Sequence, residues 1–279
     1  MKKVISVILA FCFAFSFFAL ASSAEEYATE MPEQKVHGFI TARDGAKIEY
    51  AIYGDMDAEP LVMLPCNGND MHNFDNNLLP EMAEHFMVIT VSPRGTGQSE
   101  RGEGELTFDV ESDDLLCMLD ELGIEKTHLF GFSDGGNLAI VFAVNYPDRV
   151  LSLVPVGANI SPLGTKINSQ IPIVTKYIKY AIEAYFTKDP EIALKRDIQK
   201  MMVTQPTLKF RDLKKITAPT LNIYADDDMM WPWHSQKITK SIPNAIELRV
   251  PDSGHSDILE FKDELFTKMF EFYEGIEAM

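Results

Sequence analysis

Cysteine is scarce in this chain, with 3 residues among 279: Cys12, Cys66 and Cys117. This number is too small for a disulfide framework, and no cysteine and histidine cluster has the spacing of a zinc site. Cys12 follows a bulky phenylalanine inside an apolar run, which makes it a poor lipid-attachment site. Cys117 falls on a helical pattern of apolar residues and is predicted to be a small core residue.

Basic residues are also few. Lys and Arg number 25 against 42 Asp and Glu, so the formal net charge is -17, and no basic cluster is present. This balance argues against nucleic acid and against anionic membrane surfaces as partners. The chain has no internal repeat or low-complexity segment, and its 46% hydrophobic and 24% charged residues are typical of a globular protein.

An apolar run at residues 4–20 follows Lys2 and Lys3 and is followed by small residues. This layout predicts a secretory signal over residues 1–24, cleaved after Ala24 or three residues earlier. An uncleaved anchor is the alternative, because the run approaches the minimum length that spans a bilayer. Two acidic residues directly after the small ones favour cleavage. We therefore expect an exported protein, periplasmic or secreted, without stable membrane association after cleavage.

The remaining residues, 25–279, are predicted to form one domain in which strands alternate with helices. Such alternation predicts the α/β class: a mostly parallel, eight-stranded sheet with helices on both faces. The expected strands are residues 36–42, 47–53, 61–64, 87–91, 127–132, 150–156, 220–224 and 245–250. The expected helices are residues 78–85, 108–122 and 137–143, and a last one carrying apolar residues between 258 and 272.

The alternation breaks between about residues 161 and 211, and a stretch of about fifty residues is too long for a simple connection. Its apolar spacing predicts two helices, which we interpret as an inserted helical lid over the carboxyl edge of the sheet. Tyr185 and Phe186 in the insertion, with Trp231 and Trp233 further on, are the expected substrate contacts in an apolar cleft. Packing in the core is the alternative for most apolar side chains of the insertion.

A strand-to-helix turn at residues 127–137, THLFGFSDGGN, contains the pattern Gly-x-Ser-x-Gly around Ser133. Such a turn exposes the serine hydroxyl at a helix N-terminus, where developing negative charge is favoured. A glycine-rich loop that happens to contain a serine is the alternative. A nucleophilic serine needs a base and an orienting carboxylate. Candidates for these follow in LNIYADDDMM, residues 221–230, and in PDSGHSD, residues 251–257.

The order Ser, Asp, His, with each motif at a strand end, resembles the α/β-hydrolase superfamily, in particular serine esterase-like hydrolases with a helical lid. The resemblance covers about residues 36–273. It implies that Ser133 is the nucleophile, His255 the general base and Asp228 the triad acid. Asp226 is an alternative for the acid, as is the aspartate that follows it.

The family usually has His-Gly after its third strand, where this chain has Pro65 and Cys66. The resemblance then places the backbone N–H donors of the oxyanion hole on Asn67 and on Asp134, the residue after the nucleophile. The Cys66 thiol is either an inert buried group or one that is reachable through the active-site cleft.

The resemblance implies hydrolysis of a small to medium carboxylic ester, a small-molecule substrate, through an acyl-enzyme and without a metal or cofactor. A C–C bond hydrolase, a thioesterase or amidase, a perhydrolase and an acyltransferase use the same triad and remain alternatives. A ligand-binding protein on a hydrolase scaffold is a further alternative, because fold does not imply turnover.

Overall fold

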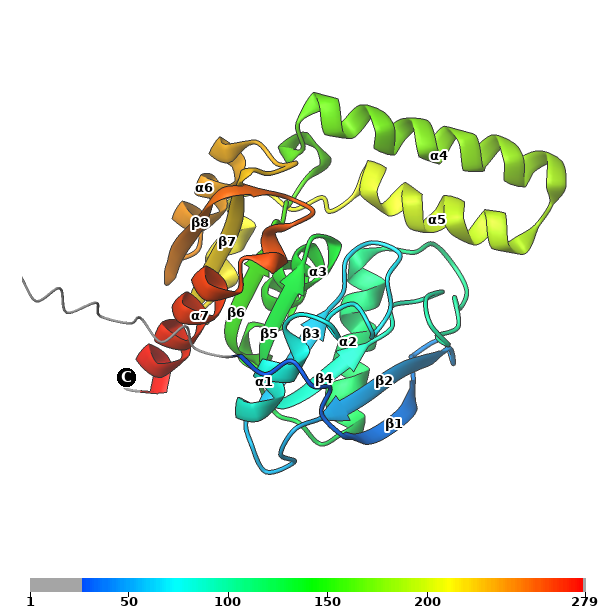
Figure 1. Ribbon diagram of the computed structural model, residues 1–279. Helices are drawn as coiled ribbons and strands as arrows, with labels where there is room; N and C mark the ends of the chain where they lie inside the picture. The colour runs from blue at the N-terminus through cyan, green and yellow to red at the C-terminus, as the bar shows by residue number, and fades with distance from the viewer. Residues whose placement is uncertain (1–26, 278–279) are drawn as a thin grey trace, which may run out of the picture.

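The computed structural model describes residues 27–277, so the predicted signal at 1–24 lies outside the described residues. One eight-stranded sheet runs through the domain in the order β1-β2-β4-β3-β5-β6-β7-β8 (Figure 1). β1 pairs antiparallel with β2, and β2 with β4, while all other pairs are parallel. The strands are β1 Gln34–Thr41, β2 Lys47–Tyr53, β3 Pro60–Leu64, β4 Met87–Val91, β5 Thr127–Phe132, β6 Val150–Val156, β7 Thr220–Asp227 and β8 Ala245–Gly254. The predicted mostly parallel, eight-stranded sheet is confirmed.

Helices cover both faces of this sheet, as predicted. Apolar side chains of α2, α3 and α6 pack in the core on one face, and those of α1 and α7 pack in the core on the other. The helices are α1 Leu79–His85, α2 Phe108–Glu121, α3 Asp134–Asn145, α4 Ile167–Thr187, α5 Pro190–Thr204, α6 Pro232–Ser241 and α7 Lys262–Glu277. The central strand β5 is buried along its whole length, which is why its sequence is a nearly continuous apolar run.

One helix was not expected from the sequence, and another begins three residues earlier than predicted. The sequence did not predict α6, because its amphipathic pattern is short and begins at Pro232, directly after Trp231. α3 begins at Asp134 instead of residue 137, since the two glycines that follow are poor helix formers by propensity yet lie in its first turn. Tertiary packing therefore decides both helix starts.

The inserted segment between β6 and β7 forms a helical hairpin of α4 and α5. Lys188 ends α4 in the left-handed region at φ 57°, and the Asp189 side chain caps α5 by accepting a hydrogen bond from Glu191 N. The base of the hairpin is joined to the segment after β7. Lys166 N donates to Met229 O at 2.8 Å, and Trp231 N donates to Gly164 O at 2.8 Å.

The turn after β4 is held by Arg94, which is buried and carries no predicted chemistry. Its guanidinium donates to both carboxyl oxygens of Asp114 at 2.6 and 2.8 Å, and to those of Asp44 at 2.6 and 3.0 Å. The hydrogen bond from Arg94 lowers the pKa of Asp44. Such bidentate pairs fix geometry as well as charge, so this turn is a rigid wall beside the central strands.

Among residues 27–277, no helix is both long enough and apolar enough to cross a bilayer.

Candidate active site

The turn between β5 and α3 holds Ser133 in a strained backbone conformation, with φ 56° and ψ -117°. The flanking glycines are required by close backbone approach. A Cβ at Gly131 would collide with the backbone of Gly135, and one at Gly135 would collide with the backbone of Leu64. Ser133 N donates to Val156 O at 2.8 Å, which fixes the turn against the end of β6. The hydroxyl is half-buried and stands at the N-terminus of α3.

Three side chains from three strand ends meet at this turn. Ser133 Oγ lies 2.9 Å from Nε2 of His255, and Nδ1 of His255 lies 2.8 Å from Oδ1 of Asp228. The His255 ring stacks on Phe132 with its centroid 5.3 Å away, which limits its rotation. Since parallel strands end at the same edge of a sheet, β5, β7 and β8 bring together residues that lie far apart in the sequence.

Asp228 is the aspartate that reaches the histidine. Its carboxyl is buried and accepts hydrogen bonds from Ala225 N at 3.1 Å and Met230 N at 3.3 Å. Burial opposes ionisation of this carboxyl. The hydrogen bond to His255, the charge of His255 and the two backbone amides together outweigh burial and lower the pKa of Asp228. Asp228 is therefore held as a carboxylate beside the imidazole.

The two alternative acids point elsewhere. Asp226 pairs with Arg249 at 2.5 Å, and exposed Asp227 pairs with Lys166 at 2.8 Å, at the base of the hairpin. Each of these carboxylates is engaged by a basic side chain, whereas the hydrogen bond to the imidazole of His255 comes from Asp228.

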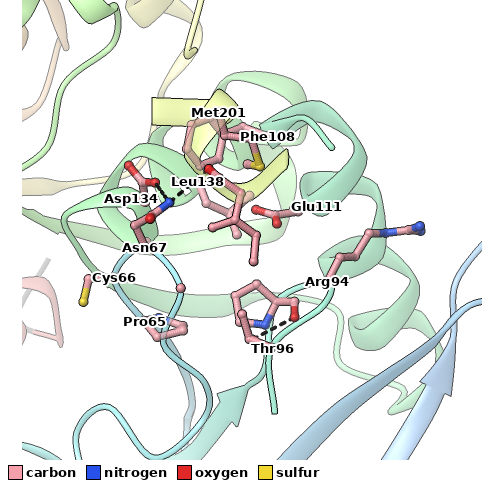
Figure 2. Close-up of a pocket in the computed structure, with 14 residues that line it drawn as sticks. Pro65, Cys66, Asn67, Arg94, Thr96, Phe108, Glu111, Asp134, Leu138 and Met201 are labelled. Carbon is pink, nitrogen blue, oxygen red and sulfur yellow. Dashed lines mark hydrogen bonds between the residues drawn. The ribbon is translucent and has the colours of Figure 1, made fainter. Parts of the chain in front are cut away.

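The two expected oxyanion-hole residues are joined by a side-chain contact. Asn67 Nδ2 donates to Asp134 Oδ2 at 2.8 Å (Figure 2). Asn137 Nδ2 donates to the other oxygen at 3.0 Å. Asp134 is the first residue of α3, so its N–H has no acceptor within the helix. The loop after β3 is thereby tied to the start of α3, on the nucleophile's side of the sheet.

A cavity of about 30 Å³ lies behind this contact, and Figure 2 shows the Glu111 carboxyl pointing into it. Within the described chain, no side-chain hydrogen bond reaches that carboxyl. Burial, with the nearby charges of Asp114 and Asp134, raises the pKa of Glu111 to about 8. Burial likewise raises the pKa of Asp134 to about 6, although the hydrogen bond from Asn67 and the charge of His255 act to lower it. A volume of this size is enough for one or two waters.

Cys66 lies half-buried in the loop that carries Asn67. Its thiol donates to Asn73 Oδ1 at 3.2 Å and accepts from Asn69 Nδ2 at 2.8 Å. Burial raises the pKa of the Cys66 thiol, which disfavours the reactive thiolate. The backbone oxygens of Leu64 and Pro65 crowd Gly135, so the unusual loop still packs tightly on the nucleophile turn.

Two of the four aromatic residues expected to contact substrate, Tyr185 and Phe186, lie far along α4, which corrects the sequence expectation for this pair. Tyr185 and Phe186 are 68% and 77% exposed near the far end of α4. They are 18 and 19 residues from the start of that helix, which at 1.5 Å per residue is about 27 Å from its base. Trp231 lines a groove with the first turns of α4, and Trp233 is exposed at the start of α6.

Residues of α5, instead, approach the site. Ile198 and Met201 line the cavity beside Asn67 and Asp134, and Ile198 O accepts a hydrogen bond from Asn67 Nδ2 at 3.4 Å. Their apolar spacing was visible in the sequence, but it could not say which surface they pack against. Glu111 was also missed as a cavity residue, because an acid in the first turn of a helix is ordinarily solvated.

No group of three or more Cys, His, Asp and Glu in the part of the chain that the structure describes is arranged to hold a metal ion. The hydrogen bonds that join the Ser133, His255 and Asp228 side chains support nucleophilic chemistry at the Ser133 hydroxyl.

A serine, a histidine and an aspartate joined in series at the carboxyl edge of a parallel sheet define the class of α/β-hydrolases. The family model for the alpha/beta hydrolase fold matches residues 59–207, more than half of the chain. The chain therefore belongs to the alpha/beta hydrolase fold family, and it is a hydrolase.

Relatives and solved structures agree with this assignment. The human serine hydrolase BPHL is 25% identical over 265 residues, with 90% of this chain and 89% of the human protein covered. The 2-hydroxy-6-oxononadienedioate/2-hydroxy-6-oxononatrienedioate hydrolase of Paraburkholderia phymatum is 31% identical over 225 residues, with 78% and 73% covered. A hydrolase structure from Pseudomonas aeruginosa has the same fold, with a TM-score of 0.70, 22% identity, and 86% and 98% of the two chains covered.

Proposed function

We propose that this chain is a serine-dependent hydrolase of small to medium carboxylic esters. The observation that carries the proposal is the series of contacts from Ser133 Oγ to His255 Nε2 and from His255 Nδ1 to Asp228 Oδ1, at 2.9 and 2.8 Å. A base within hydrogen-bond reach of a hydroxyl, itself oriented by a buried carboxylate, activates that hydroxyl as a nucleophile.

In the proposed reaction His255 takes the Ser133 proton at Nε2 while Oγ attacks the ester carbonyl carbon. Asp228 accepts a hydrogen bond from Nδ1–H and stabilises the imidazolium that forms. His255 then returns the proton to the leaving alkoxide, which leaves an acyl-serine. A water deprotonated by the same imidazole attacks the acyl carbon. The imidazolium then returns that proton to Ser133 Oγ as the Oγ–acyl bond breaks, and the carboxylic acid departs.

The negative oxygen of each tetrahedral intermediate is assigned to the backbone N–H groups of Asn67 and Asp134. A preorganised donor of this kind typically lowers the barrier by about 3–4 kcal/mol. The Asn67–Asp134 side-chain bond supports this assignment, because it holds the two donor-bearing segments at one spacing.

Hydrolysis of a C–C bond is the second candidate, favoured by the relative named as a hydrolase of a dienedioate. A dioate carries two carboxylates, which need cationic partners. Two basic side chains near this site are already paired, Arg94 with Asp114 and Lys166 with Asp227. The buried carboxyl of Asp134 would further oppose a dianion. These charges favour a neutral ester.

A fluorophosphonate probe and an ester panel test the proposal. The protein should be labelled once, and Ser133→Ala should lose both labelling and turnover. Acyl esters of graded chain length, with matched amides, thioesters and a C–C bond substrate, should show the highest kcat/KM for an ester. Labelling that survives Ser133→Ala contradicts the nucleophile assignment, and cleavage of the C–C substrate alone supports the second candidate.

A further inference from the structure

One face of α4 is apolar and exposed along its length. At about 100° per residue, Ile167, Ile171, Ile178, Ile182 and Tyr185 fall within one arc of the helix. Each is at least 50% exposed. The residues of α4 that are buried lie on another side of the helix, toward α5. The exposed stripe is therefore additional to the face that packs the hairpin.

Other exposed apolar side chains extend this stripe at both ends, and we call the whole set the α4 surface. Phe186 adds to the far end, and Leu163, Trp231 and Trp233 add to the end near the sheet, where an open groove of about 500 Å³ is lined by Leu163, Ile167, Ile171 and Trp231. Nine of the thirteen large hydrophobic side chains that are exposed among residues 27–277 belong to the α4 surface. A patch of this kind marks an interaction site.

The position of the hairpin makes the α4 surface accessible. In Figure 1 α4 is the outermost helix, and α5 lies between it and the sheet domain. The stripe runs for about 29 Å from Ile167 to Phe186. A flat partner can therefore reach the whole stripe without contact with the rest of the domain.

Along α4 and its two flanking lysines, the charge is opposite to that of the chain as a whole, although Lys166 is paired with Asp227. From Lys166 to Lys188 there are four lysines and one acidic residue, Glu183, in a chain of net charge -17. Lys179 borders the stripe along α4, and Lys188 lies over the Tyr185 ring at 4.4 Å from its centroid. An apolar helical face bordered by lysines, with aromatic residues at its ends, is the pattern of a helix that lies in a lipid interface.

We propose that the α4 surface docks reversibly on a phospholipid bilayer, with the apolar stripe in the headgroup boundary and the lysines against lipid phosphates. The net negative charge of the chain opposes stable membrane association. The lysines of α4 and its outermost position allow a weak and reversible association. A second copy is the other occupant to consider. A twofold contact centred on Ile178 would bring Lys179 of the two copies toward each other, and like charges oppose such a contact.

The test uses protein that begins at Glu25 and so keeps every described residue, with Ser133→Ala to prevent lipid turnover. Vesicles of phosphatidylcholine with one quarter phosphatidylglycerol should carry the protein in flotation. Both tryptophans of the chain, Trp231 and Trp233, lie in the α4 surface. Their emission should shift to the blue on binding and be quenched by brominated lipid.

Ile171→Glu with Ile178→Glu should lower the partition coefficient by about ten-fold or more, because two exposed aliphatic side chains that would enter the bilayer are replaced by charges. Ile246→Glu is the matched control, since Ile246 on β8 is 48% exposed, close to the 50% of Ile178. If the double variant fails to fold, as judged by circular dichroism, Lys179→Glu replaces it and should weaken binding to the anionic vesicles.

Absence of flotation and of quenching overturns the proposal. So does an equal loss of binding with Ile246→Glu, which would indicate non-specific adsorption. A concentration-dependent dimer in analytical ultracentrifugation that Ile178→Glu abolishes, without vesicle binding, overturns it in favour of a second copy.

Discussion

Replacing Glu111 with glutamine keeps the shape of the side chain and removes a carboxyl group whose ionisation is strongly disfavoured by burial. The pKa of Glu111 rises from an ordinary value of 4.5 to about 8, chiefly through burial. A raised carboxyl pKa means that the folded protein retains a proton that the unfolded chain has released. The stabilisation from this group is therefore complete below pH 4.5 and is lost as pH rises through about 8.

The size of the effect follows from the same two values. One pKa unit corresponds to about 1.4 kcal/mol, so the full loss approaches about 5 kcal/mol at pH 9. We expect the free energy of unfolding of the wild type to fall steadily between pH 5 and pH 9. Glu111→Gln should have nearly the same stability as the wild type at pH 5 and should exceed it by several kcal/mol at pH 9.

Urea denaturation at a series of pH values measures this difference. Glu125→Gln is the control, because Glu125 is exposed and the substitution is the same. Asp134, with a pKa of about 6, remains in the variant and leaves a smaller decline between pH 4 and pH 6. Parallel stability curves for the wild type and Glu111→Gln from pH 5 to pH 9 would refute the reasoning.

Three further predictions concern the site and the N-terminus. Asp228→Asn should lower kcat by about four orders of magnitude, because the imidazole of His255 is then misoriented, whereas kcat of Asp226→Asn should stay within about three-fold of the wild type. Ester hydrolysis rates of the two variants measure this difference. A larger loss in Asp226→Asn would make Asp226 the acid. Asn67→Ala keeps the backbone N–H of residue 67 but loses the side-chain hydrogen bond to Asp134, so kcat should fall about ten-fold with KM little changed. A rise in KM alone would instead indicate that the Asn67 side chain contacts substrate. Natively expressed, exported protein should begin at Glu25 or three residues earlier by intact mass, and a retained initiator methionine would indicate an anchor.

The sequence by itself determined the architecture and the order of the site motifs. Buried parallel strands require near-continuous apolar runs, so β4, β5 and β6 were predicted with the bounds that the structure has. The turn at Ser133 was predictable because only glycine fits where the backbones of β3, β5 and α3 meet. Local patterns suffice where the constraint is local.

Only the tertiary structure decided how the insertion and the acids are used. A continuous α4 carries Tyr185 and Phe186 far from Ser133, and α5 brings Ile198 to the Asn67 loop instead. Apolar spacing identifies a helical face but not the surface that covers it. Glu111 looks like any acid at the start of a helix, and its burial comes from the packing of distant segments around it. These outcomes depend on contacts between residues far apart in the chain, and no local pattern encodes them.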